Sequence, residues 1–309
     1  MPAIMKSLIL YHDDCLNHDP GHNHPERADR VRAVLSALEN MPGTERLPAP
    51  LASREQICRA HDPDYYSLLQ KSEPEEGLVT LDPDTFMSAG SFNASLRASG
   101  AACFAIDQVC AGKSRNAFCV TRPPGHHAEA SVAMGFCLFN HAAVAARHAQ
   151  AEHGIERVAI LDFDVHHGNG TQAIFEKSPE VLYVSSHQFP LYPGTGQHDE
   201  VGLGNILNLP LPPNSGSDQF RATWAALGLP AVRLFQPELI IISAGFDAHE
   251  KDPLGQLELQ DEDFGWITGE IRDLAENLCD GRLISILEGG YDLEALASAS
   301  RTHVEALTT

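Results

Sequence analysis

Short apolar runs alternate with longer amphipathic stretches along most of the chain. The short runs have the length of buried β-strands, and the longer stretches carry apolar residues at helical spacing. This alternation predicts an α/β protein whose mostly parallel central sheet is flanked by helices on both faces. The predicted strands are residues 8–11, 117–121, 158–164, 181–186, 239–243 and 283–287, and the predicted helices are residues 25–39, 93–109, 140–153, 218–235, 261–278 and 293–307.

Proline and glycine mark the ends of these elements. Pro25 suits the start of a helix, and Gly154 suits the end of one. Three stretches rich in these residues, 47–50, 192–196 and 209–216, are predicted to be loops. The sequence shows neither an internal repeat nor an interdomain linker, so residues 1–309 are predicted to form one domain.

Composition narrows the range of partners and compartments. Apolar residues make up 43% of the chain, enough for a large core, and the formal net charge is −21. Such an acidic protein is not expected to bind nucleic acid or anionic membranes. The first apolar run, residues 8–11, is too short for a signal or membrane segment. Seven cysteines without a CxxC pair predict reduced thiols and a cytoplasmic location.

Ionisable residues and glycines gather directly after four of the predicted strands. In parallel α/β sheets, ligands bind beyond the carboxyl ends of the strands, so these segments are expected to converge on one site. They are residues 122–128, 162–170, 244–247 and 288–291.

A metal site is the first chemistry that these segments indicate. Asp164 and His166 are two residues apart at a predicted strand end, so their side chains should point to the same face. Asp247, after another strand, is the natural third ligand. Two carboxylates and one imidazole would leave a zinc ion an open position for water and a substrate carbonyl.

Groups suited to proton transfer lie on the same segments. His126 and His127 could take a proton from a metal-bound water and give one to a leaving amine. Asp162 and Asn169 are candidates for orienting the two imidazoles. A carboxylate raises the pKa of an imidazole more than an amide does, so the two histidines should differ in basicity. Tyr291, after two glycines, could donate to a tetrahedral oxyanion.

Long motifs follow one another in order, from His24-Pro-Glu to the C-terminal helix. They read RPPGHHAE at 122–129, GFCLFN at 135–140, DFDVHHGNGTQ at 162–172, PGTG at 193–196, SAGFD at 243–247 and LEGGYD at 287–292. Together they resemble the class II histone deacetylase and acetylpolyamine amidohydrolase superfamily. The resemblance implies the arginase/deacetylase fold and hydrolysis of an N-acetyl amide with one zinc ion per chain.

Matching positions carry the superfamily's ligand sites onto this chain. The resemblance places zinc on Asp164, His166 and Asp247. It places a structural monovalent cation, usually potassium, on Asp162, Asp164, His166, Ser185 and Ser186. The walls of a narrow channel for the acyl-lysine stem would be Gly135, Phe136 and Tyr192.

The resemblance also assigns catalytic roles. His127 would be the general base and acid, and His126 an electrostatic partner held by Asp162. Class I members carry Asp where this chain has Asn169, so His127 should be less basic than in that class. Some class II members that are poor deacetylases replace the tyrosine by histidine, whereas this chain keeps Tyr291.

Two other functions are alternatives to zinc-dependent deacetylation. The arginase branch of the fold binds two manganese ions through extra carboxylates, but Gly168 and His249 stand where its motifs have Asp. A dinuclear site is therefore not expected. A module that binds acetyl-lysine without cleaving it is disfavoured, because every matched catalytic position is filled.

The motifs are compatible with more than one class of substrate. Some relatives select polyamines with an acidic gatekeeper, and the matching residue here is Leu254. An apolar residue favours an open rim for acyl-lysine in peptides or related acyl amines, with acetylpolyamines or other small acyl amides as the alternative. Asp82 or Asp84 would hold a substrate N–H at that rim, or else cap a turn. Arg27 and Arg30 are placed like superfamily arginines behind the site, but both are interpreted as exposed helix charges.

Overall fold

A sheet of eight parallel strands forms the centre of the protein. The computed structural model describes residues 5–309, and the strand order is β2-β1-β5-β10-β9-β6-β7-β8. The four strands that precede the predicted site segments, β5, β10, β9 and β6, are neighbours in this order. The strands are β1 (Ser7–Tyr11), β2 (Thr44–Pro48), β5 (Ala117–Cys119), β6 (Val158–Asp162), β7 (Val181–Gln188), β8 (Ile206–Leu211), β9 (Leu239–Ala244) and β10 (Leu283–Leu287).

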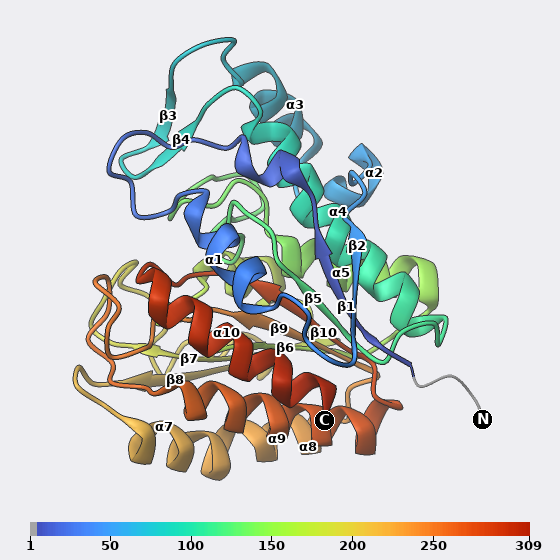
Figure 1. The fold of residues 1–309 in the computed structure, drawn as a ribbon. Coiled ribbons are helices and arrows are strands. Elements are labelled where there is room, and N and C mark those ends of the chain that lie inside the picture. The colour runs from blue at the N-terminus through green and yellow to red at the C-terminus, as the bar shows by residue number, and fades with distance from the viewer. Residues whose placement is uncertain (1–4) are drawn as a thin grey trace.

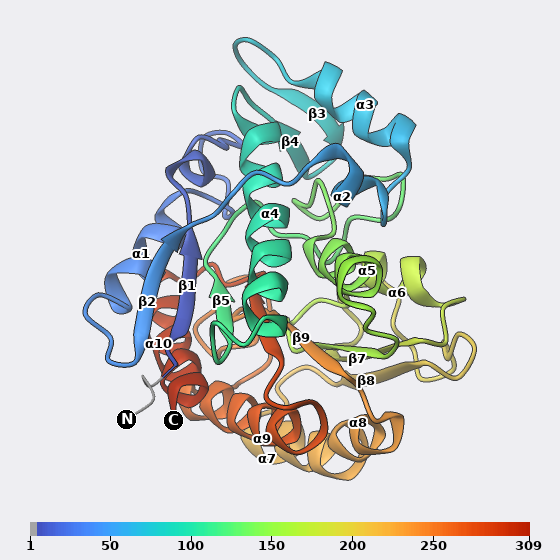
Figure 2. The same ribbon diagram turned by 90° about the vertical axis from the view of Figure 1, so that its right-hand side faces the viewer.

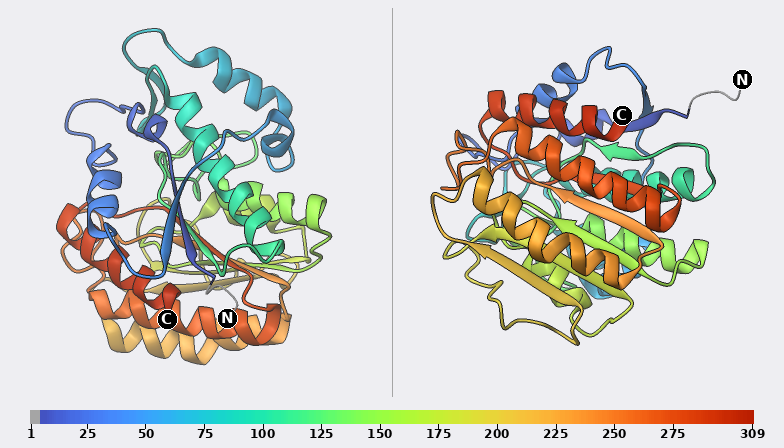
Figure 3. Two further views of the ribbon diagram at one scale, coloured as in Figure 1. Left: turned by 45° about the vertical axis from the view of Figure 1, so that its right-hand side comes forward. Right: turned by 90° about the horizontal axis from the view of Figure 1, so that it is seen from below.

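Helices cover both faces of the sheet, as the alternating pattern predicts (Figures 1 and 2). One face carries α1 (Asp29–Ala37), α9 (Asp261–Cys279), α10 (Leu293–Thr308) and a continuous helical segment of α7 (Ser217–Thr223), η2 (Trp224–Gly228) and α8 (Leu229–Phe235). Figure 3 shows α8, α9 and α10 side by side across this face. The other face carries α4 (Ser91–Cys110), α5 (His141–His153) and α6 (Asn169–Phe175).

The core is divided by the sheet, because successive side chains of a strand point to opposite faces. In β6, Ala159 and Leu161 pack with α9 and α10, whereas Val158 and Ile160 pack with α4 and α5. All four side chains are fully buried. Strands buried on both faces are mainly apolar, which explains why these central strands were predictable.

A smaller group of elements surrounds the upper part of α4, with α3, β3 and β4 at the top of Figure 1. It contains η1 (Asp13–Leu16), α2 (Arg54–Cys58), α3 (Pro63–Ser72) and an antiparallel hairpin of β3 (Val79–Asp82) and β4 (Thr85–Met87). Asp62 caps α3 and Pro63 occupies its first turn, a common helix start. Within residues 5–309, no helix is both long and apolar enough to cross a membrane. All seven cysteines are free thiols, as predicted.

Both edge strands differ from the sequence prediction. The segments 47–50 and 209–216 were predicted to be loops, but β2 contains Pro48 and β8 contains Pro210. Proline cannot donate a hydrogen bond to a neighbouring strand, so it is tolerated only where a strand lies at the edge of a sheet. The strand order places β2 and β8 at the two edges.

The strand that leads to the predicted metal ligands is shorter than expected. It ends at Asp162, so Asp164 and His166 lie in the following loop rather than on the strand. Asp162 Oδ1 accepts from the backbone N–H of Asp164, and Asp164 Oδ1 accepts from that of His166. These local side-chain bonds turn the backbone away from the sheet.

The first helix begins at Asp29 instead of Pro25, because Glu26 is turned into the core. The Glu26 carboxylate accepts a bidentate pair of hydrogen bonds from Arg122 at 2.7 and 2.6 Å, and another from Arg30 at 3.2 Å. The expectation that Arg30 is exposed is therefore wrong: its side chain is completely buried. Arg27 is half-exposed, as expected.

We expect Glu26→Ala to lower the free energy of unfolding by about 3–5 kcal/mol, because it leaves two buried guanidinium groups without their carboxylate. Urea denaturation measures the change. Burial opposes ionisation, but Arg122 holds the pKa of Glu26 well below its usual value. The stabilisation should therefore persist above the ordinary pKa of about 4.3 and decline only as the pH falls below it. Asp29→Ala, which removes an exposed carboxylate, is the control; equal midpoints for both variants would contradict the expectation.

Candidate active site

Asp164, His166 and Asp247 converge at the carboxyl ends of β6 and β9. Their candidate ligand atoms lie within 4.8 Å of one another, and all three residues are buried. His166 Nδ1 is 3.2 Å from Asp164 Oδ1 and 3.1 Å from Asp247 Oδ2. The other carboxylate oxygens accept from the backbone, Asp164 Oδ2 from Gly289 and Asp247 Oδ1 from Val165. One oxygen of each carboxylate therefore faces the imidazole nitrogen.

The electrostatics of this cluster favour a bound cation. Burial and the neighbouring Asp164 carboxylate raise the pKa of Asp247 to about 7. Burial opposes a charge on His166, but its hydrogen bonds to Asp164 and Asp247 raise the pKa of His166 to about 10. The two buried carboxylates therefore stabilise a positive charge placed between them. This donor set of two oxygens and one nitrogen fits a zinc ion.

A second group of potential ligands joins α4 to α5, but it does not suit a metal. Asp107 Oδ1 lies 2.9 Å from His148 Nε2 and 2.7 Å from His153 Nε2. Arg59 donates to His148 Nδ1 at 3.1 Å. Because a guanidinium can only donate, the proton of neutral His148 must be on Nε2, where a metal would bind.

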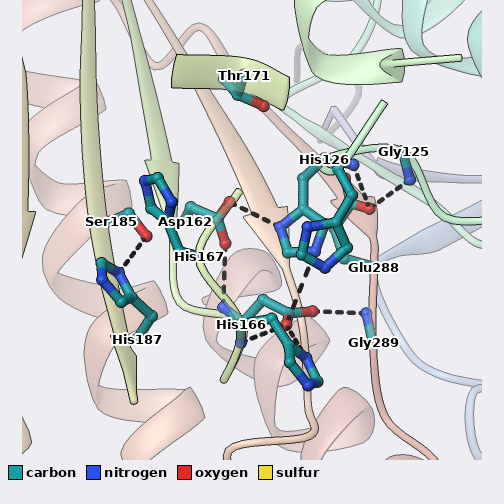
Figure 4. Close-up of polar contacts among 12 residues, drawn as sticks. Gly125, His126, Asp162, His166, His167, Thr171, Ser185, His187, Glu288 and Gly289 are labelled. Carbon is teal, nitrogen blue, oxygen red and sulfur yellow. Dashed lines mark hydrogen bonds and ion pairs between the residues drawn. The ribbon is translucent and has the colours of Figure 1, made fainter. Parts of the chain in front are cut away.

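His126 and His127 lie beside the cluster, with ring centroids 4.1 Å apart. His126 Nδ1 is 3.0 Å from Asp162 Oδ2, and His127 Nδ1 is 2.8 Å from Asn169 Oδ1. Figure 4 shows the ring of His126 against Asp162 and its backbone against Glu288. The Glu288 carboxylate accepts from the backbone N–H groups of Gly125 and His126, which holds the histidine loop in place.

The two imidazoles have opposite electrostatic environments. Burial opposes a charge on His126, but the carboxylates of Asp164 and Asp162 raise its pKa well above the usual value. Burial, His126 and His166 hold the pKa of His127 well below the usual value. These directions agree with the unequal basicity expected from a carboxylate on one imidazole and an amide on the other.

Tyr291 faces the same cavity from the end of β10. Burial raises the pKa of its phenol well above the usual value, so the hydroxyl keeps its proton and can donate. The guanidinium of Arg30 lies 4.8 Å from the centre of the tyrosine ring and donates to the backbone carbonyls of Glu288 and Gly290. Asp252 accepts from the backbone N–H of Tyr291 at 2.6 Å. Tyr291 is therefore contacted at its ring by Arg30 and at its backbone by Asp252.

His127, His166 and Tyr291 border a cavity of about 270 Å³. Apart from these three residues and Asp84, its lining is mainly apolar, a composition suited to an aliphatic stem that carries a polar end group. The lining residues are Asp84, His127, Gly135, Phe136, His166, Leu191, Tyr192, Leu254 and Tyr291.

Gly135 has no room for a side chain. Its φ is +56°, and a Cβ at this position would collide with the imidazole of His127. We expect Gly135→Ala to lower kcat/KM by about 10²-fold, because displacement of a catalytic group by about 1 Å has an effect of this size. Steady-state kinetics measures the loss. Gly77→Ala is the control, since Gly77 also has a positive φ but lies in open space; equal activity of the two variants would contradict the steric argument.

A family model described as the histone deacetylase domain matches residues 24–307, which include every residue of this site. The chain belongs to the histone deacetylase family.

Individual relatives agree with this membership. A protein of Pseudomonas aeruginosa named histone deacetylase-like amidohydrolase is 41% identical over 276 residues, covering 87% of this chain and 72% of that protein. Human polyamine deacetylase HDAC10 is 36% identical over an alignment of 326 residues, covering 98% of this chain and 48% of that protein. The crystal structure of the HDA15 HD domain has a TM-score of 0.92 and 35% identity, covering 98% of this chain and 88% of that one. These matches confirm the predicted superfamily and fold.

The structure separates the two rim aspartates of this histone deacetylase family member. Asp84 lines the cavity and accepts from the backbone N–H of Gly135. Asp82 is not part of the lining; its carboxylate accepts from the backbone N–H of Asp84, as in a turn. Of the two candidates, only Asp84 therefore lies on the cavity, and its role in substrate binding stays a prediction.

Two of the residues predicted to bind a structural cation are neighbours in the sheet, and both serine hydroxyls have other partners. Ser185 pairs with Asp162 in the register of β6 and β7, and its hydroxyl is 2.9 Å from His187 Nδ1. Ser186 Oγ accepts from the indole N–H of Trp224 at 2.9 Å. Asp162 also accepts from the hydroxyl of Tyr183.

Apart from Arg30, which the resemblance also placed behind the site, the residues that support the site from behind were not predicted. A buried carboxylate or guanidinium has no local sequence signal unless its partner is near in the chain, and only Glu26 and Arg30 are four residues apart. The supporting residues are Glu26, Arg30, Glu129, Tyr183, Asp252 and Glu288.

Proposed function

We propose that this protein is a zinc-dependent deacetylase that hydrolyses the amide of N-acetylated or other short-chain N-acylated lysine side chains. The convergence of Asp164, His166 and Asp247 beneath a mainly apolar cavity is the observation that carries the proposal. His127 and Tyr291 border the same cavity, so a base and a hydrogen-bond donor are both present. Membership of the histone deacetylase family supports hydrolase chemistry.

Asp164, His166 and Asp247 would hold the zinc ion. When bound, zinc would lower the pKa of water and polarise a carbonyl oxygen. A single ion is favoured over the two of arginases, because the chain lacks the additional carboxylates at this point. His249, which stands where an arginase has Asp, lies 3.4 Å from Asp261 instead.

The side chains around the cavity would divide the proton transfers. His127 donates from Nδ1 to Asn169, which leaves Nε2 free to accept a proton from the attacking water and return it to the leaving amine. His126, whose raised pKa favours the imidazolium form, would remain charged beside Asp162 and Asp164. The Tyr291 hydroxyl would donate to the carbonyl oxygen as negative charge develops there.

A structural potassium ion is a second part of the proposal. Asp162 and Ser185 lie next to each other in the sheet and would contribute oxygens, together with Asp164 and His166. Ser186 would contribute through its backbone, because its hydroxyl is bonded to Trp224. Such an ion would help to hold the loop that carries the metal ligands.

The cavity favours acyl-lysine in peptides over acetylpolyamines as substrate. Phe136 and Tyr192 provide apolar walls for an aliphatic stem, and Leu254 gives the rim an apolar side chain instead of an acidic gatekeeper. Asp84, which lines the same cavity, would accept a substrate N–H at the rim. The name of the human relative makes acetylpolyamine the alternative substrate.

Kinetics on paired substrates tests the proposal. We expect a higher kcat/KM for acetyl-lysine peptides than for acetylated spermidine, and a clear preference for the polyamine would overturn the choice of substrate.

We expect Tyr291→Phe to lower kcat by about 10²–10³-fold, the usual effect of removing one donor to an oxyanion. Steady-state kinetics with an acetyl-lysine peptide measures the loss. Tyr11→Phe, which removes a hydroxyl bonded to Asp13 at the surface, is the control. Unchanged turnover in Tyr291→Phe would exclude the role given to the phenol.

A further inference from the structure

The amide of Asn169 lies between an imidazole and a carboxylate. Its Oδ1 is 2.8 Å from His127 Nδ1, and its Nδ2 is 3.1 Å from Glu129 Oε1. Asn169 is the first residue of α6 and is 7% exposed, whereas Glu129 is partly exposed. One short bridge therefore connects the cavity histidine to a carboxylate near the surface.

The chemistry of the carboxylate fixes the orientation of the amide. An ionised carboxylate only accepts hydrogen bonds, so the amide atom next to Glu129 must be the NH₂ group. The amide oxygen then faces His127, and the proton of a neutral His127 must be on Nδ1. This leaves Nε2 as the nitrogen that can accept a proton in the cavity.

The opposite amide orientation would disable the base. It would place Asn169 Oδ1 against the Glu129 carboxylate, an unfavourable contact between two acceptors. Its NH₂ group would donate to His127 Nδ1, so the imidazole proton would move to Nε2. A neutral imidazole with a proton on Nε2 cannot accept another from water in the cavity.

The remaining contacts of the Asn169 amide nitrogen are weaker. The backbone carbonyl of His127 lies at 3.4 Å and the sulfur of Met134 at 3.3 Å. Glu129 provides the only carboxylate among its hydrogen-bond partners in residues 5–309. Charge-assisted hydrogen bonds are about twice as strong as neutral ones, so Glu129 dominates the choice of orientation.

We propose that Glu129 is a positioning residue that selects the tautomer of His127 by orienting Asn169. The inference rests on the proposed function, in which His127 is the base. It also gives a physical reason for an amide at position 169, because an Asp there would face the Glu129 carboxylate at hydrogen-bond distance.

The tautomer of His127 is the direct test. Long-range ¹H–¹⁵N spectra of ¹⁵N-histidine-labelled protein distinguish protonated from bare ring nitrogens, and His127→Ala identifies the signals. We expect a proton on Nδ1 in the wild type and in Glu129→Gln, whose amide oxygen can still accept from Asn169. We expect a mixture of tautomers in Glu129→Ala. Glu75→Ala removes the same charge from an exposed loop and should match the wild type.

Kinetics provides the second readout. We expect Glu129→Ala to lower kcat by about tenfold, which is a small part of the 10²–10⁴-fold that a positioned base contributes. KM and the content of bound zinc should change little. Glu129→Gln should recover most of the loss. Asn169→Asp should be less active than the double variant Asn169→Asp/Glu129→Gln, which relieves the repulsion between carboxylates.

Two outcomes would overturn the inference: an unchanged His127 tautomer in Glu129→Ala, or a Glu129→Ala enzyme with wild-type kcat. The spectra do not depend on turnover. A normal tautomer response in a protein without deacetylase activity would therefore refute the proposed function and leave the role of Glu129 intact.

Discussion

Asp247→Ala is expected to abolish both zinc binding and deacetylase activity. The carboxylate contributes Oδ2 to the buried cluster, 3.1 Å from His166 Nδ1, and the cluster has one other carboxylate. Removing it leaves two ligands for an ion that takes three from the protein in catalytic sites. Metal analysis of the purified variant and a peptide deacetylation assay measure the two losses.

The second histidine and aspartate group supplies the control for this substitution. His153→Ala removes a member of the Asp107, His148 and His153 group, in which the tautomer of His148 opposes metal binding. We expect His153→Ala to keep the zinc content and activity of the wild type. One zinc ion per chain in Asp247→Ala, or loss of zinc in His153→Ala, would show that the metal is bound elsewhere.

His127→Ala is expected to lower kcat/KM by about 10²–10⁴-fold, the usual contribution of a positioned general base. His127 is the imidazole whose pKa is held low by burial, His126 and His166, so it is neutral and can accept a proton. Zinc content should not change, because His127 is not among the ligands. Steady-state kinetics together with metal analysis measures both quantities.

His126→Ala is the matched variant for this prediction, since both histidines are buried in the same loop. We expect a smaller loss of activity, because His126 is paired with Asp162 and acts on the reaction through its charge. A larger loss of activity in His126→Ala than in His127→Ala would show that His126, and not His127, is the general base.

The sequence was most informative where the structure is buried on both sides. The first four residues of β6 are all apolar because helices cover both faces of the sheet, so the position of the strand could be predicted. Its end was predicted two residues too late, because the turn after Asp162 is made by side-chain bonds to the backbone. Asp164, His166 and Asp247 were nevertheless grouped correctly, since parallel strands bring their carboxyl ends together.

Features that depend on long-range partners were not predictable. Arg30 has the pattern of an exposed helix charge, but the carbonyls that it contacts belong to Glu288 and Gly290, far along the chain. The edge strands β2 and β8 contain prolines that usually indicate loops. The choice between Asp82 and Asp84 depended on the conformation of the β3–β4 hairpin, which a spacing of two residues does not specify.

Zinc titration of metal-free protein tests the central claim most directly. The site has one group of three ligands, so activity on an acetyl-lysine peptide should rise in proportion to added zinc and stop rising at one ion per chain. Activity that requires two ions per chain, or full activity before zinc is added, would contradict a mononuclear zinc deacetylase.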